Sequence, residues 1–524
     1  MSADTVLVVG AGPTGLTMAI ELVRRGVDVR IIDRAARANT ETRALGVQAR
    51  TLELFERSGV AHELLTRGLR ARRFNVLSEG RRILSADFAG LPTAYPFLLM
   101  IPQNEVERVL TGRLADHGVH VERERTLTAL NAGPRSCTVT IDDGTGRAET
   151  GEYAWVIGAD GAHSAVRRLL DVGFVGTAFD EAFAVADLRI DWERPAEEFF
   201  AFLHRGRFAA FFPMTGGWHR VAIAQPPSPR NGQRQAELGI EELQKAIDET
   251  VPGRPQIIQV RQAGRFRINQ RRAAAHRVNR VFLAGDAAHI HSVIGAQGMN
   301  TGIQDAFNLG WKLADVIRGR ADADLLDSYE AERSPIAARL VKATRRVTRM
   351  TLIGNPVGTA ARRVIAPRIL GRSSTQRLLT RAISQLDISY HDGGGAGGRG
   401  RVAVGDRAPN ASLSTSADGP TLFERLDPAG FTLIEFTTAA TTTGGSAWGE
   451  SLAALIDELP DDIAVEHVPA DSEAGRTYGI GEPTLVLVRP DGYVAARGRP
   501  EEINGYLHQH GRHRGPAATA RMEP

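Results

Sequence analysis

The chain has 524 residues, 42% of them apolar and 24% charged, which is the composition of a globular protein too long for one hydrophobic core. Its 64 Lys and Arg residues nearly balance 61 Asp and Glu residues, so no overall field draws nucleic acid or an anionic membrane to the surface. The single cysteine, Cys137, excludes an internal disulfide and a thiolate metal cluster, and no apolar run of about 18 residues predicts a membrane span. We therefore expect two or three domains in a reducing, cytoplasmic compartment.

The first 32 residues have the pattern that opens a doubly wound parallel sheet. Residues 5–9 are a β-branched run that ends at a glycine turn. Apolar residues then repeat with helical spacing from Leu16 to Val23 until Gly26, and residues 27–32 predict a second strand. This order of strand, helix and strand predicts an α/β fold.

A glycine motif lies between the first predicted strand and the helix. Gly10, Gly12 and Gly15 form G-x-G-x-x-G, in which the missing side chains let a pyrophosphate approach the helix N-terminus. Asp33 follows 18 residues after Gly15, where a carboxylate can accept hydrogen bonds from a ribose. The motif predicts a dinucleotide site; the alternative is a tight turn with a surface aspartate.

Later segments predict how the rest of the chain is organised. Strand-then-glycine patterns return at 153–158 and 281–285, so we assign residues 1–174 and 265–391 to one discontinuous nucleotide-binding domain with a helical extension. Short alternating runs, such as 201–203 and 208–212, predict an inserted antiparallel sheet that forms a substrate domain at 175–264.

Residues 301–317 have one apolar helical face, and an Arg-rich helical region continues to about Leu386. Six glycines in residues 392–400 predict a linker. A separate unit at 401–510 has predicted strands at 431–436, 463–468 and 484–488 and a helix at 451–459. Residues 511–524 are expected to be a loose tail.

Two further motifs carry a resemblance to a known family. Residues 158–167 (GADGAHSAVR) resemble the D-G segment of flavoprotein hydroxylases, and residues 285–289 (GDAAH) resemble their G-D segment. With the first glycine motif they resemble the three-part signature of class A flavin monooxygenases, over about residues 4–390. The resemblance implies bound FAD, with NADPH or NADH and O2 as cosubstrates.

The resemblance also implies a reaction. In the family, the nicotinamide reduces the flavin, oxygen adds at C4a, and the resulting hydroperoxide hydroxylates an electron-rich ring of a phenolic or polycyclic aromatic, polyketide-like substrate. Where relatives have Pro, a small residue, Gly and Gly, this chain has Val293, Ile294, Gly295 and Ala296. That departure leaves open a Baeyer-Villiger or epoxidising oxygenase and, from another class, a non-catalytic flavin-binding scaffold.

By the same resemblance, a set of residues is expected to contact FAD: Gly10, Gly12, Thr14, Gly15, Asp33, Arg34, Arg43, Gln103, Leu127, Asp160, Asp286, Gly298, Met299 and Asn300. Asp286 is expected to accept a hydrogen bond from the ribityl chain, with a turn cap as the alternative. Residues 295–300 lead into the helix predicted at 301–317, whose positive end should point at the flavin. Asp160 and Arg167 are expected to serve both FAD packing and the approach of the nicotinamide, and Arg43 has a surface ion pair as its alternative.

The substrate wall is expected from the apolar residues Phe202, Phe211, Phe212, Pro213 and Met214, together with Val293 and Ile294; plain core packing is the alternative. Arg43 and His289 are the candidates for a catalytic role. His289 and His291 could act on a substrate hydroxyl or only satisfy loop carbonyls. No His or Cys cluster has metal-ligand spacing, so no metal is expected.

The C-terminal unit resembles a thioredoxin fold, most clearly at residues 482–492 (EPTLVLVRPDG), where Pro483 is a candidate cis proline. Without a C-x-x-C motif it cannot exchange disulfides, so we expect an interaction or stabilising appendage. The expected partners are small molecules, without nucleic acid or membrane, and a homodimer is considered.

Overall fold

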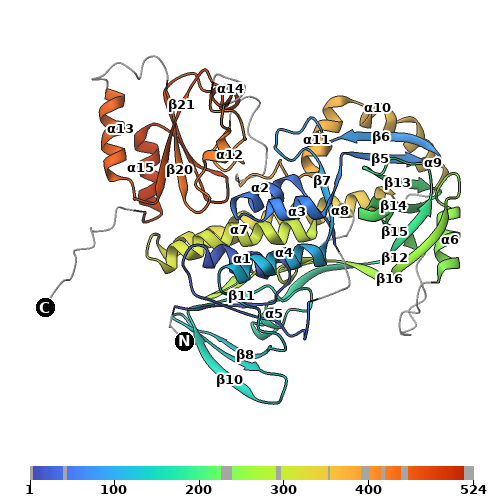
Figure 1. Cartoon of the computed structure of the whole chain (residues 1–524), viewed down its shortest axis with the longest axis horizontal. Coiled ribbons are helices and arrows are strands. Elements are labelled where there is room, and N and C mark those ends of the chain that lie inside the picture. The colour runs from blue at the N-terminus through green and yellow to red at the C-terminus, as the bar shows by residue number, and fades with distance from the viewer. Residues whose placement is uncertain are drawn as a thin grey trace.

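The structure is a computed structural model, and it describes residues 4–38, 44–225, 239–290, 297–351, 355–390, 402–414, 419–437 and 447–512 (Figure 1). Arg43, His291, Val293, Ile294 and the predicted linker lie outside the described residues. No helix in the described ranges is long and apolar enough to cross a membrane.

The central layer is a five-stranded sheet with the strand order β17-β18-β11-β1-β2. Its strands come from distant parts of the chain: β1 (Val6–Val9), β2 (Val29–Ile32), β11 (Trp155–Gly158), β17 (Arg277–Val278) and β18 (Val281–Leu283). β1 pairs in parallel with β2 and β11, and β11 pairs in parallel with β18. The predicted doubly wound sheet is therefore confirmed, including its assembly from separated segments.

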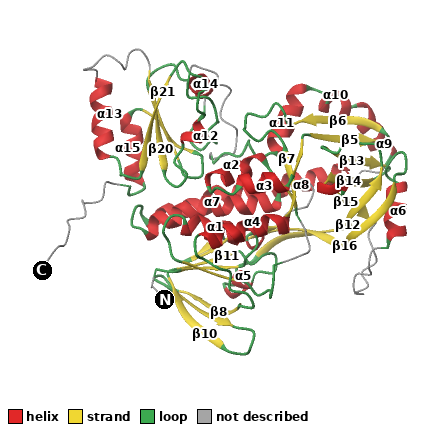
Figure 2. Ribbon diagram, viewed as in Figure 1, coloured by secondary structure: helices red, strands yellow, loops and turns green. Residues whose placement is uncertain are grey.

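Both faces of this sheet are covered (Figure 2). The helices α1 (Pro13–Val23), α4 (Gln103–Asp116) and α7 (Gly298–Ile317) pack on one face. The other face packs on a small sheet of β8 (Thr126–Ala132), β9 (Cys137–Asp142) and β10 (Ala148–Tyr153). Burial on both faces explains why β1 is the uninterrupted apolar run Val-Leu-Val-Val.

Shorter elements complete the nucleotide-binding part: β3 (Leu45–Val47), α2 (Ala49–Arg57), α3 (Ala61–Arg67), β4 (Leu69–Ala71), β7 (Leu98–Pro102), α5 (Ala165–Leu169), the 3-10 turn η2 (Gly285–Ala287), the 3-10 turn η3 (Ala323–Leu326) and α8 (Asp327–Thr351). β3, β7 and β4 form a sheet of their own beside α2 and α3.

An eight-stranded sheet with the order β19-β16-β12-β15-β14-β13-β5-β6 forms the second part. Its strands are β5 (Arg73–Ser78), β6 (Arg81–Asp87), β12 (Phe174–Asp191), β13 (Glu198–His204), β14 (Arg207–Pro213), β15 (His219–Gln225), β16 (Gln256–Ala273) and β19 (His289–Ile290), with the 3-10 turn η1 (Thr215–Gly217) between β14 and β15. β5 and β6 belong to residues that the sequence analysis placed in the nucleotide-binding domain. They join this sheet because β5 pairs in parallel with β13, a long-range pairing without a local signal.

Helices cover this sheet from two sides. α6 (Ile240–Asp248) packs on one face, with Leu243 and Ile247 in its core. The helices α9 (Pro356–Val364), α10 (Ala366–Leu370) and α11 (Ser373–Ile383) follow α8, and α10 and α11 contact β6 from the other side (Figure 1).

The C-terminal unit has a four-stranded sheet with the order β21-β20-β22-β23, in which β20 and β21 are parallel and β22 and β23 are antiparallel. Its elements are α12 (Leu422–Arg425), β20 (Phe431–Thr437), α13 (Ala447–Glu458), β21 (Ile463–Pro469), α14 (Glu473–Tyr478), β22 (Thr484–Val488), β23 (Val494–Gly498) and α15 (Pro500–Gln509). This order is that of a thioredoxin-like unit, as predicted, although the sequence analysis missed β23 and α15.

One expectation for this unit was wrong. The described residues contain no cis peptide bond, so the bond before Pro483 is trans, the form that X-Pro bonds favour by about 0.5–1 kcal/mol. The structure describes the chain to Arg512, which is 3% exposed and binds Asp315 at 2.7 Å, so this part of the expected loose tail is packed; residues 513–524 lie outside the described residues.

Candidate functional site

The first glycine turn is close-packed on one side and open on the other. A Cβ atom on Gly15 would lie 1.9 Å from the Gly10 carbonyl oxygen, and one on Gly10 would lie 2.4 Å from that of Ala159. A Cβ on Gly12 would meet nothing within 4 Å. No side chain caps α1 and no acidic residue lies in its first turn, so its amides face open space that fits a pyrophosphate.

Asp33 orders this turn. Its two carboxylate oxygens accept hydrogen bonds from the backbone N–H groups of Ala11 at 2.7 Å and Ala35 at 2.8 Å. Its side chain is 18% exposed, and the exposed Arg34 follows it. The contact of Asp33 with a ribose stays a prediction, and the structure adds a second role, fixing the glycine turn to the end of β2.

The G-D turn meets the glycine turn and α7 at one point. A Cβ on Gly302 would lie 2.4 Å from Thr14 Oγ1 and 3.0 Å from Gly285 Cα, and one on Gly285 would lie 2.5 Å from Thr14 Oγ1. The Gly285 N–H donates to Asp305 at 3.0 Å. Asp286 is exposed beside this contact, where its carboxylate can meet a ribityl hydroxyl. Three segments that are far apart in the sequence thus share one site.

The start of α7 faces the same region. No side chain caps this 20-residue helix and its first turn has no acidic residue, so its positive end is available to an anionic group. Gly298 and Met299 are half-buried there. Asn300 is fully buried, and its amide donates to Gly46 O at 3.1 Å and accepts from Gln48 N at 2.9 Å. These bonds make Asn300 a link between α7 and the start of α2.

The D-G segment has a largely internal role. Asp160 accepts hydrogen bonds from Ser164 Oγ at 2.5 Å and from the amides of Ala165 and Val166, so it caps α5. Burial raises the pKa of Asp160, although the Ser164 bond opposes that shift. Arg167 donates to the Ala287 carbonyl at 2.8 Å and to that of Ala162 at 2.9 Å. It joins the D-G and G-D turns, and its guanidinium is engaged inside the protein.

Two further residues that are expected to contact FAD make contacts within the protein. Leu127 is 4% exposed in the core beneath the central sheet, where β8 packs, so the structure gives it a packing role. Gln103, at the start of α4, exchanges hydrogen bonds with the backbone of Ala44 at 3.2 and 3.3 Å. It therefore holds the residue that directly follows Arg43.

His289 is not placed to act on a substrate. Its side chain is 1% exposed, and its Nε2 lies 2.6 Å from Asp305, which also accepts from Arg333 Nε at 2.7 Å. Burial alone would raise the pKa of Asp305, but His289 and Arg333 outweigh burial and hold the pKa below its usual range. We infer that His289 supports the G-D turn. In the described part of the chain, no group of His, Cys, Asp and Glu side chains could hold a metal ion.

The aromatic residues of β13 and β14 divide between two faces. Phe202 and Phe211 pack against the α6 core, with their ring centroids 5.7 Å apart, and both are fully buried. Phe212 points to the opposite face, where it stacks on Phe199 at 5.7 Å. Met214 is buried in the same core as Phe199. Phe202 and Phe211 are thus corrected to core residues, because successive strand residues face opposite ways.

A buried ion pair lies on the Phe212 face and was missed by the sequence analysis. Arg220 pairs directly with Phe212 across β14 and β15, and its Nε and Nη2 donate to Asp187 at 2.8 and 2.9 Å. Arg220 Nη1 also donates to the Ala44 carbonyl at 3.3 Å. The only signal was a charged residue within each largely apolar strand, and that signal does not identify the face.

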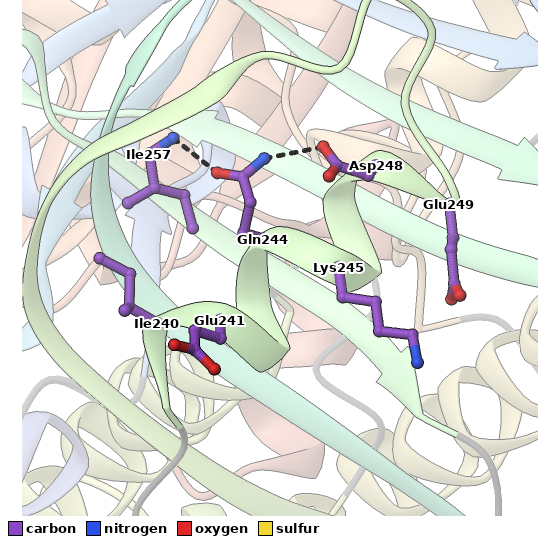
Figure 3. A pocket seen from close by; sticks show the side chains of 7 residues that line it. All are labelled: Ile240, Glu241, Gln244, Lys245, Asp248, Glu249 and Ile257. Atoms are coloured by element: carbon purple, nitrogen blue, oxygen red, sulfur yellow. Dashed lines mark hydrogen bonds between the residues drawn. The ribbon is translucent and has the colours of Figure 1, made fainter.

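An open hollow of about 460 Å³ lies along α6, lined by Ile240, Glu241, Gln244, Lys245, Asp248, Glu249 and Ile257 (Figure 3). Gln244 spans it, accepting from Ile257 N at 2.8 Å and donating to Asp248 at 2.8 Å. Glu241 and Lys245 are exposed. Since α6 packs on the Phe211 face, this hollow is separate from the glycine turns (Figure 1).

Comparisons with known proteins agree with this geometry. Residues 3–344 match the family described as FAD binding domain, and residues 401–513 match the family described as aromatic-ring hydroxylase, C-terminal. The chain is 35% identical to 6-methylpretetramide 4-monooxygenase of Streptomyces rimosus, over 94% of this chain and 90% of that one. It is 34% identical to pentachlorophenol 4-monooxygenase of Sphingobium chlorophenolicum, over 95% and 94%.

A solved structure, the OxyS anhydrotetracycline hydroxylase from Streptomyces rimosus, superposes with a TM-score of 0.76 at 30% identity and covers 97% of this chain and 98% of its own. Aklavinone-11 hydroxylase in a complex with FAD and aklavinone shares the fold with a TM-score of 0.75 at 23% identity, covering 98% and 99%.

Proposed function

This chain belongs to the FAD-dependent aromatic-ring hydroxylases, and from that premise we propose that it hydroxylates a phenolic or polycyclic aromatic, polyketide-like compound. It is an FAD-dependent monooxygenase. The observation that carries the substrate proposal is the apolar face around Phe212, which belongs to the same core as the helices that cover the central sheet.

Bound FAD, once reduced by NADPH or NADH, supplies the chemistry that activates O2 for transfer of one oxygen atom to an aromatic ring. The residues of this chain hold and orient it. The open amides of α1 beyond Gly12 bind the pyrophosphate, and Asp286 accepts a hydrogen bond from the ribityl chain. The uncapped start of α7 stabilises negative charge on the flavin.

The substrate wall is proposed on the face that carries Phe212, Arg220 and Asp187. Pro213, the next residue along β14, faces the other way, with Phe211. Phe212 is half-buried and offers apolar surface for an aromatic ring, and the buried Phe199 supports it by stacking. Arg220 is held in one orientation by Asp187, and it is the side chain of this face that is proposed to donate a hydrogen bond to a phenolic oxygen. The compounds in the names of these relatives range from a chlorinated phenol to tetracycline intermediates, which supports a phenolic substrate.

The test is oxygen incorporation by the FAD-loaded protein. The protein is incubated with NADPH or NADH, ¹⁸O2 and a panel of phenols and polycyclic phenolic polyketides, with a no-substrate control. We expect one compound to stimulate nicotinamide oxidation and to gain one labelled hydroxyl. A ring-expanded lactone as product would indicate a Baeyer-Villiger oxygenase, and an epoxide would indicate an epoxidising oxygenase. Either product would contradict the proposed hydroxylation. FAD binding without labelled product across the panel would favour the non-catalytic scaffold.

A cytoplasmic location is part of the proposal, because the reaction consumes NADPH or NADH. Cys137 is a buried free thiol, which is compatible with a reducing compartment. A homodimer stays a prediction that light scattering tests.

A further inference from the structure

The turn between β22 and β23 of the C-terminal unit reaches into the nucleotide-binding part. Within this turn, the Gly492 N–H donates to the Arg489 carbonyl at 2.8 Å, and Gly492 has a φ of +74°. The side chains at its two sides, Arg489 and Asp491, are 6% and 2% exposed. A charged turn that is this deeply buried must be compensated by groups around it.

The first set of partners comes from α7 and α8. Arg489 donates to both oxygens of Glu332, at 2.6 and 2.9 Å, and to both oxygens of Asp491, at 3.0 and 2.6 Å. Lys312 Nζ donates to Glu332 at 2.7 Å, and Asn308 donates to it at 2.6 Å. Burial alone would raise the pKa of Glu332, but Arg489 and Lys312 outweigh it and keep the carboxylate charged.

The second set of partners comes from the start of α2. Arg50 donates to the backbone carbonyl of Asp491 at 2.5 Å and to Glu53 at 3.1 Å. Arg407, also from the C-terminal unit, donates to Glu53 at 2.8 Å. A Cβ on Gly492 would lie 3.3 Å from the Arg50 guanidinium, so the turn and α2 are in direct contact.

Both sets of partners are next to the flavin turns. Gln48, directly before α2, donates its N–H to Asn300 at the start of α7. Arg333 follows Glu332 and donates to Asp305, whose other oxygen accepts from Gly285 of the G-D turn. The turn of the C-terminal unit is therefore linked by short buried contacts to two of the three segments that meet at the site.

We propose that Arg489 and Asp491 are positioning residues that hold α2, α7 and α8 in the arrangement required for FAD binding, so that the C-terminal unit is a working part of the flavin site. The proposal rests on the FAD-dependent function but not on the identity of the substrate. Its test measures flavin binding and reduction potential, so its failure is distinguishable from failure of the hydroxylation proposal.

The full-length variants Arg489→Gln and Asp491→Asn remove one charge each, and Asp491→Asn keeps the backbone carbonyl that Arg50 uses. Arg512→Gln is the matched control. It breaks another buried ion pair between the C-terminal unit and α7, at Asp315, which is about 22 Å along the helix from Asn300. Loss of thermal stability is expected from all three variants, because each leaves a buried partner charge.

Only Arg489→Gln and Asp491→Asn should weaken FAD binding, by about tenfold in the dissociation constant. In these two variants α7 is displaced, and its positive end stabilises reduced FAD less well. A further tenfold loss of affinity for reduced FAD relative to oxidised FAD lowers the two-electron reduction potential of the bound flavin by about 30 mV. Arg512→Gln should keep wild-type values for both. If Arg489→Gln does not fold, Asp491→Asn carries the test.

Two outcomes would overturn the proposal. In the first, the turn variants lose stability but keep the wild-type FAD affinity and potential. In the second, Arg512→Gln loses FAD to the same extent as they do, which would make the effect general loosening of the C-terminal unit.

Discussion

Gly302→Ala tests most sharply whether the glycine turn, the G-D turn and α7 meet as described. The new methyl group would lie 2.4 Å from Thr14 Oγ1 and 3.0 Å from Gly285 Cα, whereas ordinary contact begins at 3.4 Å. The Thr14 hydroxyl can rotate away, but Gly285 Cα belongs to the backbone of the flavin turn. The substitution therefore pushes the G-D turn away from α1 and α7.

The magnitude follows from two opposing effects. Overpacking of this kind costs about 1–3 kcal/mol, and alanine in place of glycine inside a helix recovers about 1 kcal/mol. The free energy of unfolding should fall by about 0–2 kcal/mol. The shift of the G-D turn weakens FAD binding, whereas the higher helix propensity of alanine stabilises the fold without improving FAD binding. We therefore expect the FAD dissociation constant to rise about tenfold, which corresponds to about 1.4 kcal/mol.

The assay is FAD titration of the apoprotein by flavin fluorescence, with denaturant unfolding in parallel. Gly112→Ala in α4 is the matched control, because a Cβ there meets nothing within 4 Å; it should stabilise the protein by about 1 kcal/mol without changing FAD affinity. Thr14→Ala, alone and combined with Gly302→Ala, completes a double-mutant cycle. Because Thr14→Ala removes one of the two atoms that the new methyl group would meet, the double variant should recover part of the lost FAD affinity. The reasoning is refuted if Gly302→Ala behaves like Gly112→Ala in both measurements.

Three further predictions concern single side chains. Asp286→Ala should raise the FAD dissociation constant about ten- to hundredfold, the equivalent of a hydrogen bond to a charged group, without destabilising the apoprotein; unchanged affinity would argue against the ribityl contact. Burial, then His289, lowers the pKa of His276 from 6.5 to about 4, so stability is complete above pH 6.5 and is lost as pH falls toward 4. Between pH 7 and pH 5 the wild type should lose about 2 kcal/mol that His276→Phe does not lose, and equal losses in denaturant unfolding would contradict this assignment. Phe211→Ala should lower the free energy of unfolding by about 3–5 kcal/mol with KM unchanged, whereas Phe212→Ala should raise KM for the aromatic substrate. If instead Phe211→Ala raised KM and Phe212→Ala did not, Phe211 would belong to the substrate wall, as the sequence had suggested.

The parts that could be predicted from sequence are those with local signals. The glycine turn between β1 and α1, the acid at the end of β2 and the apolar run of β18 each combine a short motif with an element boundary. These combinations are informative because glycines at such a boundary allow a tight turn and let the backbone approach a pyrophosphate. The order of the three motifs then identified the family.

Features that depend on pairing across distance had no local signal. Every residue of β14 from Phe208 to Phe212 is apolar, so the strand shows no alternation of polar and apolar residues from which its two faces could be assigned. The sequence therefore could not show that Phe211 faces α6 and Phe212 faces the nucleotide-binding part. His289 and Asp305 are 16 residues apart and meet only because β19 and α7 pack together. Arg489 and Glu332 are 157 residues apart, and neither has a neighbour in sequence that predicts the other.

The central claim is that the glycine turn, the G-D turn and the start of α7 form one flavin site, and it is tested most directly by the flavin content of the purified protein. The apoprotein is incubated with excess FAD, desalted, and measured by its visible absorbance against its protein concentration. We predict a yellow protein that retains one FAD per chain. A protein that stays colourless after this reconstitution would contradict the account.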